Sequence, residues 1–486
     1  MKTVIIIGSG FSSLTAACYM QQAGYEVTVL EKNEQLGGRA SILQEAGFTF
    51  DMGPSWYWMP DVFEKFYNDF GKTTSDFYVL QKLSPAYRVF FEKGNPIDIE
   101  DNSAKIMATF DSIDPGSGAR LKSFLEKAKK NYEIAMQDLV YQPGLNIAEL
   151  ITLDTAKRLP LFIKNIKQEV AKVTQNENLR SILEFPVLFL GAKPSNTPAF
   201  YNFMNWADFG LGTWYPQGGM YEVVKAMVTL AQELGVKLKT HEEVVKINHK
   251  GKRVVSVTTK KVSYTADIII SGADYAHTES LLEEDKRNFN KSYWDTRTFA
   301  PSSLLYYIGL DSPVEEVAHH NLFFDTDFDK HAEEIYDSKI YPSNPLFYAN
   351  FPSIVDDTLA PKGKATAFFL IPIAVDLEND ADKHEEYFQL ILNRFKARTG
   401  IGLSDKIIYK KSFGVQDFKD RYHACKGNAY GLANTLLQTS ILRPPIKNKN
   451  LENLFYTGQL TVPGPGVPPA IISGKVVSDY IMKKDI

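Results

Sequence analysis

The first residues of the chain whose types and spacing could do chemistry are two glycines near its start. Gly8 and Gly10 interrupt the apolar run in IIIGSGFSSL, and a segment of helical composition follows them. A G-x-G pair at such a junction lets the backbone approach a phosphate, and the helix that begins there presents unpaired N–H groups to an anion. Glu31 follows 21 positions after Gly10, and a carboxylate at that spacing accepts hydrogen bonds from ribose hydroxyls. These residue types predict a nucleotide site.

Three short elements must position this site. Residues 4–7 have the β-branched composition of a strand buried on both faces of a parallel sheet, residues 14–23 favour a helix, and residues 25–30 favour a second strand. Such a succession is the size of one βαβ unit. Ser13 stands where a third glycine would serve helix packing, and we expect this small residue to leave the phosphate site in place. The carboxylate of Glu31 disfavours NADP, which leaves FAD and NAD open.

A second glycine pair distinguishes these two cofactors. Gly37, Gly38 and Arg39 follow soon after the acidic residue, in EKNEQLGGRASILQEAGFTFDMGPSW. The glycines give another close backbone approach, and the guanidinium is a fixed cation for a second stretch of a long, diphosphate-containing ligand. This extension favours FAD. The pattern resembles the glutathione-reductase-like FAD families, in which L-G-G-R follows the second strand of the Rossmann unit.

The C-terminal segment NLFYTGQLTVPGPGVPPAIISGKVVSDYI supplies the other part of the predicted flavin site. Residues 453–457 favour a strand that Gly458 ends, and a loop of prolines and glycines leads to a helix over residues 468–481. Proline is tolerated in the first turn of a helix because the N–H groups there have no intrahelical partner. The positive end of such a helix stabilises the negative charge that accumulates at flavin N1 and C2=O on reduction.

Several motifs together resemble the carotenoid desaturases of the phytoene desaturase type. Their G-x-x-x-x-P-G-x-G-[VI]-P loop is matched from Gly458 to Pro468, and their D-x-G-P-[ST] motif is matched by residues 51–55. The segments GTWYPQGGMYEVV and GNAYGLANTLLQTSILRPP resemble two further motifs of the family and occur in the same order. The chain departs from the family at Ser12 and Ser13, where glycine is usual, and within TGQLTVPGPG.

The resemblance implies a set of FAD-binding positions. In the resembling flavoproteins a valine lines the adenine through main-chain atoms, and Val244 matches that place. The predicted cofactor-binding residues are Gly8, Gly10, Phe11, Ser12, Glu31, Lys32, Gly38, Arg39, Gly53, Pro54, Ser55, Trp56, Val244, Gly458, Gln459, Val467, Pro468 and Pro469. No metal-ligand spacing surrounds any of the eight histidines. The catalytic residues stay open; Glu149 is a candidate proton acceptor, and a solvated glutamate at a helix start is the alternative.

The resemblance also implies the fold. We expect an α/β protein in which a glutathione-reductase-like FAD-binding Rossmann domain carries an inserted mixed β-sheet substrate domain and a helical, membrane-associated subregion. Residues 110–205 show mainly helical spacing, and HEEVVKINHKGKRVVSVTTKKVSYTADIIISGAD predicts three β runs with a Lys-Gly turn between the first two. The expected FAD domain comprises residues 1–85, 215–290 and 440–486, and the expected substrate domain comprises residues 86–214 and 291–439.

Composition excludes several classes of protein. A net charge of -4 gives no global reason to expect nucleic acid as a partner. The two cysteines, Cys18 and Cys425, lie far apart and indicate a reduced, intracellular protein. The N-terminus does not read as a signal peptide. The longest apolar run, residues 365–375, falls well short of the ~20 residues that a membrane-spanning helix needs.

Two segments indicate contact with lipid. Basic residues within residues 153–173, among them Lys157 and Arg158, stand beside an apolar face and suit an anionic lipid surface, with a solvated helix face as the alternative. The segment RSILEFPVLFLGAKP that follows is either core or the lining of an entrance for a hydrocarbon. We expect a peripheral, monotopic protein on the cytoplasmic side of the membrane.

The function that the resemblance implies is FAD-dependent desaturation of a long isoprenoid chain such as phytoene. An apolar tunnel would hold the chain, hydride would pass to flavin N5, and a quinone or oxygen would accept the electrons. One alternative is a flavin-free isoprenoid carrier resembling the Rab GDP-dissociation inhibitors. The other is a flavoenzyme of the amine oxidase kind, or another carotenoid desaturase.

Overall fold

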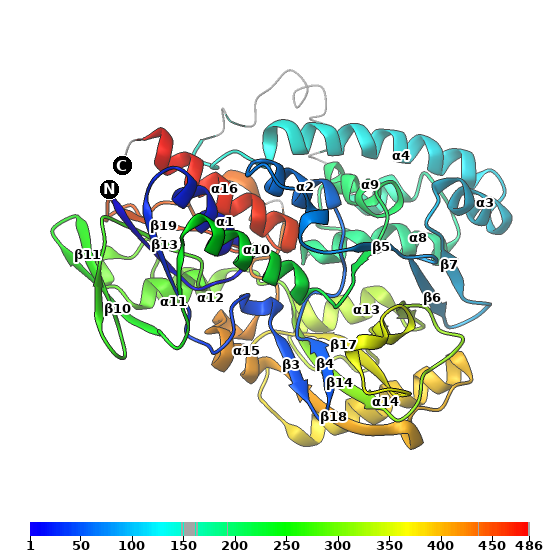
Figure 1. Cartoon of the computed structure of the whole chain (residues 1–486). Coiled ribbons are helices and arrows are strands. Elements are labelled where there is room, and N and C mark those ends of the chain that lie inside the picture. The colour runs from blue at the N-terminus through cyan, green and yellow to red at the C-terminus, as the bar shows by residue number, and fades with distance from the viewer. Residues whose placement is uncertain (147–148, 150–160, 162–163, 192, 436, 485–486) are drawn as a thin grey trace.

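Two large β-sheets and the helices around them organise the described chain (Figure 1). The computed structural model describes residues 1–146, 149, 161, 164–191, 193–435 and 437–484. Lys157 and Arg158 of the basic segment therefore lie outside the described residues. The predicted α/β architecture with a mixed second sheet is confirmed.

The first sheet is parallel throughout and is built around the N-terminal strand. Val4 on that strand lies opposite Val27 on one side and Ile268 on the other. Because side chains alternate along a strand, Val4 and Ile6 point to one face of the sheet and Ile5 and Ile7 to the other. The strands, in spatial order, are β19 (Leu454–Tyr456), β13 (Ile268–Ser271), β1 (Thr3–Ile7), β2 (Glu26–Leu30) and β9 (Lys237–Lys239).

Helices cover the face to which Val4 and Ile6 point. They are α1 (Phe11–Gln22), α10 (Tyr221–Leu234) and α16 (Val467–Lys483), with α2 (Pro60–Asn68) packed on α16. A Cβ on Gly474 would stand 2.3 Å from the carbonyl oxygen of Ser12. Glycine at this position therefore lets α16 approach the first turn of α1, so the last helix of the chain lies against the N-terminal glycine turn.

A small antiparallel sheet covers the opposite face. Its strands are β10 (Val244–Lys250), β11 (Arg253–Thr259) and β12 (Ser263–Thr265), with a turn after Lys250. The three predicted β runs are confirmed. The same segment also contains β13, which joins the parallel sheet. The sequence offered no sign of this change of partner, because a short apolar strand has the same composition in either sheet.

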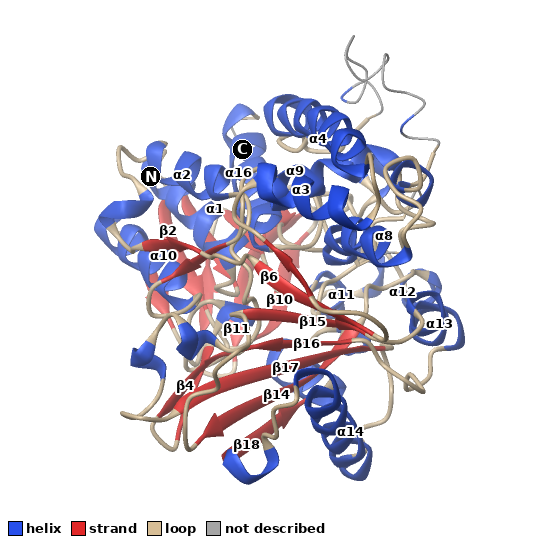
Figure 2. Ribbon diagram, turned by 90° about the vertical axis from the view of Figure 1, so that its right-hand side faces the viewer, coloured by secondary structure: helices blue, strands red, loops and turns tan. Residues whose placement is uncertain are grey.

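The second large sheet is mixed. Only its β6 and β15 strands pair in parallel, and the other neighbours are antiparallel. In spatial order its strands are β18 (Ile407–Phe413), β14 (Ser302–Leu310), β17 (Ala365–Ile373), β16 (Phe347–Asn350), β15 (His320–Phe324), β6 (Tyr87–Phe91) and β7 (Ile97–Ile99). Figure 2 shows this sheet across the lower half of the molecule, with α14 (Ala381–Thr399) against it.

The two faces of the mixed sheet serve different purposes. Leu304, Tyr306 and Ile308 of β14 pack with α14 in one hydrophobic cluster. The alternate residues Ser303 and Leu305 line the large cavity of the protein instead. Since side chains alternate along a strand, one face of β14 forms core and the other forms cavity wall.

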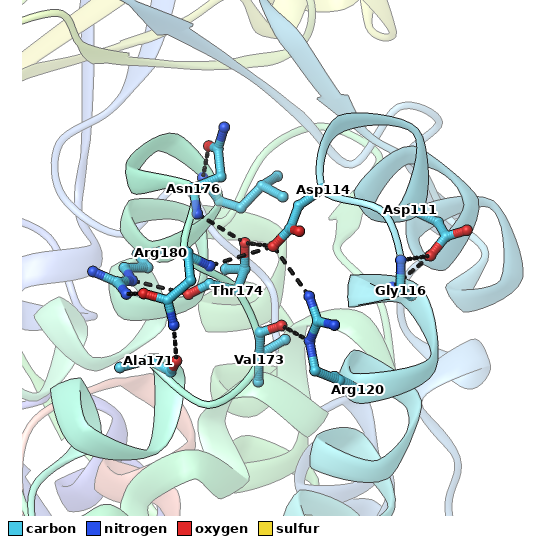
Figure 3. A network of polar contacts seen from close by, with 12 residues as sticks. Asp111, Asp114, Gly116, Arg120, Ala171, Val173, Thr174, Asn176 and Arg180 are labelled. Atoms are coloured by element: carbon cyan, nitrogen blue, oxygen red, sulfur yellow. Dashed lines mark hydrogen bonds and ion pairs between the residues drawn. The ribbon is translucent and has the colours of Figure 1, made fainter.

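Helices from the middle of the chain lie above the mixed sheet (Figures 1 and 2). The helical prediction for residues 110–205 is confirmed over the described part. Asp114 accepts a hydrogen bond from Thr174 Oγ1 at 2.6 Å, and Arg120 Nε donates to the Val173 carbonyl at 2.6 Å (Figure 3). These bonds join the turn between α3 and α4 to the turn between α7 and α8. The helices are α3 (Ser103–Ile113), α4 (Ser117–Ile134), α7 (Ile166–Val170), α8 (Glu177–Glu184) and α9 (Phe203–Phe209).

Short elements complete the described chain. Two antiparallel two-stranded ribbons pair β3 (Ile42–Glu45) with β4 (Phe48–Asp51) and β5 (Leu80–Lys82) with the distant β8 (Trp214–Pro216). The remaining α-helices are α11 (Tyr275–Ser280), α12 (Lys291–Thr296), α13 (Phe328–Glu333) and α15 (Val415–Tyr422). Single 3₁₀ or π turns are η1 (Gly38–Ala40), η2 (Thr74–Asp76), η3 (Ala135–Leu139), η5 (Phe185–Leu190), η6 (Ala199–Asn202), η7 (Glu284–Lys286), η8 (Glu334–Ser338), η9 (Pro352–Ile354), η10 (Asp357–Leu359), η11 (Ser404–Lys406), η12 (Cys425–Gly427) and η13 (Ser440–Leu442).

The predicted division into domains stays a prediction, but the strands follow its segments. All five strands of the parallel sheet come from residues 1–85, 215–290 and 440–486. The seven strands of the mixed sheet come from residues 86–214 and 291–439. Among the described helices, none has the length and hydropathy needed to cross a bilayer.

Candidate cofactor and substrate site

One cavity of about 930 Å³ brings together every residue that the sequence singled out for the cofactor. Its walls come from both large sheets, from the start of α1 and from the start of α16. The predicted residues that line it are Gly8, Gly10, Phe11, Ser12, Glu31, Lys32, Gly38, Arg39, Gly53, Pro54, Ser55, Trp56, Val244, Gly458, Gln459, Val467, Pro468 and Pro469. Their contact with a cofactor stays a prediction, but a single ligand could reach all of them.

Glu31 is held rigidly at one end of the cavity. One carboxylate oxygen accepts hydrogen bonds from Ser9 N at 3.0 Å and Ser9 Oγ at 2.5 Å, and the other accepts from Asn33 N at 2.8 Å. The strand β2 ends one residue earlier, so the carboxylate lies at the carboxyl edge of the parallel sheet, beside the glycine turn. This is the place where a ribose binds in dinucleotide folds.

Ser13 turns away from the cavity. Its side chain is fully buried, and its Oγ has no hydrogen-bond partner in the described structure. A Cβ on Gly272, just after β13, would stand 2.0 Å from this oxygen. The close approach that a third glycine usually gives to α1 is thus provided from the strand side by Gly272. The serine hydroxyl does not line the cavity, so it is not in reach of a phosphate bound there.

Arg39 is a half-buried cation without an ion pair to a carboxylate of the described residues. Its Nη2 donates to the Asn428 carbonyl at 3.2 Å. With the Gln459 amide oxygen turned toward Arg39, Nη1 and Nη2 donate to it at 2.9 and 3.1 Å. Nε has no partner. Burial lowers the pKa of Arg39, and the nearby Asp274 carboxylate opposes that shift. A guanidinium at the cavity wall with a donor to spare fits an anionic ligand such as a diphosphate.

A loop that the sequence did not connect with the cofactor closes the nucleotide end. His423 follows α15 and stacks on His277 with ring centroids 4.0 Å apart, and its Nε2 lies 2.9 Å from a Glu243 oxygen. Burial lowers the pKa of His277 to about 4, so this imidazole is neutral. Arg421, Tyr422 and His423 line the cavity beside residues of β10. No sequence signal identifies them, because single polar residues in the last turn of a short helix and just after it have no periodicity or motif of their own.

Asp274 is the second acidic group that sequence reasoning missed. It lies after β13 in the cavity wall. Its carboxylate caps α11 by accepting from Ala276 N at 3.0 Å. The other oxygen accepts from Cys425 N at 3.1 Å. Burial raises its pKa, and Arg39 opposes the shift. The aspartate therefore joins the loop after α15 to the parallel sheet.

The start of α16 forms the wall at the centre of the cavity. The lining includes Gly466, Val467, Pro468 and Pro469, which places the positive end of the helix dipole at the cavity. Because two consecutive prolines remove two N–H groups from the first turn, a ligand here meets mainly the field of the helix. The predicted helix start agrees with the observed one to within a residue.

The rest of the cavity is mainly apolar, with a few polar lining side chains such as Gln142, Lys193, Asn434 and Thr439. Among the polar lining residues, His331 has both ring nitrogens engaged, since Nδ1 accepts from Leu346 N at 3.0 Å and Nε2 lies 3.0 Å from the Pro372 carbonyl. Burial lowers the pKa of His331 to about 4, which leaves it uncharged. The apolar lining side chains include Met136, Leu139, Val140, Phe185, Phe200, Phe203, Met204, Leu322, Phe324, Ile335, Phe347 and Leu370. Such a surface suits a long hydrocarbon.

Two further expectations concern Glu149 and the apolar segment after the basic residues. Glu149 does not line the cavity: its carboxylate accepts from Gly144 N at 2.7 Å and from Leu145 N at 3.0 Å. This local role does not support it as a proton acceptor. In the segment RSILEFPVLFLGAKP, Phe185 reaches the cavity, whereas Leu183 is core. The part of the chain that the structure describes contains no group of side chains able to hold a metal ion.

Comparison with known proteins decides the family. The model of the flavin-containing amine oxidoreductases matches residues 11–482. The chain belongs to this family. It is an FAD-dependent oxidoreductase, as the sequence predicted.

Curated proteins resemble the chain over nearly its whole length. A carotenoid 3,4-desaturase from Haloarcula japonica is 40% identical over 486 residues, which are 99% of this chain and 98% of that protein. A zeta-carotene-forming phytoene desaturase from Myxococcus xanthus is 28% identical, over 99% of this chain and 94% of that protein. Among solved structures, an oxidoreductase from Methanosarcina mazei has the same fold, with a TM-score of 0.63 and 17% identity over 99% of this chain and 100% of that one.

The observed cavity fits the FAD of this family in its own residues. The carboxylate of Glu31 lies where a ribose would be bound, and Arg39 has an unpartnered Nε nearby for a diphosphate. The positive end of α16 faces the same cavity further on. An elongated ligand with an anionic middle and a ring system that gains negative charge matches this order of groups.

Proposed function

We propose that the protein is a carotenoid desaturase that oxidises a long isoprenoid chain held in the apolar part of the cavity. The observation that carries the proposal is the 40% identity to a carotenoid 3,4-desaturase over nearly the whole chain. The apolar continuation of the cofactor cavity supports it, because a hydrocarbon offers no polar group to grip and must be bound by burial.

The residues of the chain have separate tasks in such a reaction. Bound FAD would supply the acceptor for a hydride from the substrate. Glu31 and Arg39 would hold the nucleotide part, and the helix dipole of α16 would favour added negative charge. Leu305 and Leu370 from the mixed sheet belong to the wall that would orient the chain and keep water out.

The two candidate substrates differ in which carbon–carbon bond would be oxidised. The sequence motifs are those of the phytoene desaturase type, and a phytoene desaturase is 28% identical. The higher identity of the 3,4-desaturase favours an already conjugated carotenoid whose terminal 3,4 bond is still saturated. Phytoene stays the second candidate.

The experiment begins with the visible spectrum of the purified protein. A yellow protein that releases FAD is then incubated in liposomes with phytoene in one arm and with lycopene, a carotenoid saturated at the 3,4 bond, in the other. We expect a red shift of the polyene bands with the conjugated substrate. A colourless protein that cannot be loaded with FAD would support the flavin-free carrier. A yellow protein that oxidises amines and leaves both carotenoids unchanged would support the amine oxidase alternative.

The electron acceptor is tested in the same assay. We propose that the reduced flavin passes its electrons to a quinone or to oxygen, as the sequence resemblance implies. Without quinone, anaerobic turnover should stop after one equivalent of product per FAD has formed. It should continue when a quinone is added. Turnover that requires oxygen and ignores the quinone would assign oxygen instead.

Exposed leucines near one part of the cavity wall support the proposal that the protein attaches to a lipid surface. Leu145, Leu437 and Leu442 are 46%, 77% and 49% exposed. Leu442 lines the cavity, and a Cβ on Gly144 would lie 3.7 Å from the Ser440 carbonyl, so the two loops are adjacent. An apolar substrate arriving from lipid would enter beside these leucines.

The charge of the expected basic helix contributes less to membrane attachment than the leucines do. Lys167 lies 2.6 Å from Asp329 and Lys172 pairs with Glu169, so part of this charge is already compensated. Vesicle flotation of the holoenzyme should be weakened by replacing Leu437 and Leu442 with serine. The matched control replaces the exposed Val79 and Ile408, which lie elsewhere, with serine. Equal flotation of all variants would exclude the leucine rim as the attachment site.

A further inference from the structure

Arg443 carries a buried guanidinium, and it lies behind the cavity wall. It is 4% exposed and donates all five of its N–H bonds. The acceptors are the carbonyl oxygens of Leu432, Gln438, Gln459 and Thr461 and the side-chain oxygen of Asn434, at 2.6 to 3.1 Å. It forms no ion pair with a described carboxylate.

The five bonds connect the two loops that make this wall. Asn434 and residues 439–442 line the cavity from one loop, and Gln459 and Pro465 line it from the other. A Cβ on Gly464 would lie 3.5 Å from the central carbon of the guanidinium. Arg443 therefore lies directly behind the loop that leads into α16.

A buried cation without a counter-ion is an unusual component of a protein interior. Its desolvation opposes the charged state, and burial lowers the pKa of Arg443 to about 10. At neutral pH it is nevertheless charged, held by carbonyl dipoles that do not cancel its net charge. The field of that charge reaches the adjacent cavity, because the medium between them is protein and not water.

The start of α16 offers few N–H donors to a negatively charged ligand, so additional positive charge nearby matters. Pro468 and Pro469 take two N–H donors away from the first helical turn. Negative charge on a ligand at this wall is thus stabilised by long-range fields more than by direct hydrogen bonds. A fixed cation behind the same wall acts in the same direction as the helix dipole.

We propose that Arg443 is a positioning residue whose positive charge raises the reduction potential of the bound FAD. The oxidised isoalloxazine is neutral, and its reduction by two electrons and one proton at N5, which together equal a hydride, leaves one negative charge on it when N1 is not protonated. The cation stabilises the second form and leaves the first nearly unaffected. The inference rests on the FAD cofactor and is independent of which carotenoid is oxidised.

The test measures the midpoint potential of FAD in the holoenzyme by titration against a reference dye, with no substrate present. In Arg443→Gln we expect a more negative potential. The shift should correspond to a ratio of affinities, for reduced over oxidised FAD, that is on the order of tenfold lower than in the wild type. In Arg443→Lys we expect a potential near that of the wild type. Its melting temperature should be lower, because an ammonium cannot make five bonds.

Arg394→Gln is the control for the loss of a mostly buried arginine. Arg394 lies in α14, which packs on the opposite face of the mixed sheet, and pairs with Asp325, which follows β15. We expect its replacement to lower the melting temperature without moving the potential. An unchanged potential in Arg443→Gln overturns the proposal, and so does an equal shift in Arg443→Lys, which keeps the charge.

A variant that preserves the packing covers the case in which Arg443→Gln cannot be purified. Asn434→Asp keeps the oxygen that accepts from Arg443 at 2.6 Å and neutralises the guanidinium. A more negative potential is then expected. An unchanged potential in this variant also overturns the proposal.

Discussion

At the scale of single residues, the charges of the cavity wall are fixed before any ligand arrives. Glu31 is held by Ser9 and Asn33, and Arg39 is held by Asn428 and Gln459. Each keeps its charge at one place along the cavity. Such preorganisation lowers the entropy lost on binding and makes the residues separable in experiments.

Arg39→Gln should weaken FAD binding without unfolding the protein. A hydrogen bond to a charged group contributes about 1.5–3 kcal/mol, so the Kd should rise on the order of 10- to 100-fold. Quenching of flavin fluorescence during titration of the apoprotein measures it. Arg120→Gln, in the polar network of Figure 3, is the control and should bind like the wild type. An unaltered Kd in Arg39→Gln would remove the guanidinium from the diphosphate site.

Asp208→Asn should flatten the pH dependence of stability. Asp208 is buried behind the cavity, accepts one bond from Tyr87 at 2.7 Å, and leaves its other oxygen unpartnered. Burial raises its pKa from 3.8 to about 8. The folded state therefore holds a proton that the unfolded state releases, so stability is lost as the pH rises from 4 toward 8, by about 1.4 kcal/mol per pH unit.

The measurement is the urea midpoint at pH 5, 6, 7 and 8. We expect the midpoint of Asp208→Asn to fall less with pH than that of the wild type. The exposed Asp405→Asn serves as the control and should follow the wild type. Parallel curves for wild type and Asp208→Asn would show that the carboxyl is ionised in the folded state.

At the scale of elements, α1 is the centre of the cofactor half. It packs between α10 and α16 on the parallel sheet, and its first turn forms the phosphate end of the cavity. Two glycines outside it, Gly272 and Gly474, permit these close contacts. The geometry of the glycine turn thus depends on elements from three distant parts of the chain.

Gly272→Ala should displace α1 and should be rescued from the other side of the contact. The new Cβ would stand 2.0 Å from Ser13 Oγ, and overpacking of this kind costs about 1–3 kcal/mol. In Gly272→Ala with Ser13→Gly, the steric conflict disappears, and we expect most of the loss to be recovered. Unfolding midpoints of the two single variants and the double variant measure the coupling. Additive effects would mean that the two residues do not compete for this space.

At the scale of the whole molecule, the cavity joins segments from both ends and the middle of the chain. Residues 7–12, residues 273–274 and most residues between 458 and 472 contribute to its wall. A ligand that contacts all of them binds only the folded chain. FAD should therefore act as a link between the two sheets.

FAD should raise the melting temperature in proportion to the logarithm of its concentration. At one hundred times its Kd, it should add about 2.7 kcal/mol to the free energy of unfolding. Thermal unfolding of the apoprotein with increasing FAD measures this. Riboflavin, which lacks the groups expected to contact Glu31 and Arg39, is the control and should stabilise less. Equal stabilisation by FAD and by riboflavin would contradict the expectation that Glu31 and Arg39 contact the part of FAD that riboflavin lacks.

The sequence by itself determined the local elements and the chemistry of the cofactor residues. Residues 4–7, 25–30 and 453–457 are strands within a residue or two of their predicted limits, because β-branched runs between glycines have few alternatives. The glycine turn, Glu31 and Arg39 were recognised because their types and spacing recur wherever a dinucleotide binds.

Only the tertiary structure decided which distant residues complete the site. Gly272, Asp274 and His423 have no periodicity or motif that relates them to Gly8, and their roles come from packing across long sequence separations. Arg443 stands in a segment that resembles a family motif, but only the packing shows that it lies behind the cavity wall. Glu149 was a candidate on sequence, but the structure gives its carboxylate to the backbone of its own loop. Spacing along a chain reports what local geometry requires, whereas a cavity wall is defined by which elements meet in space.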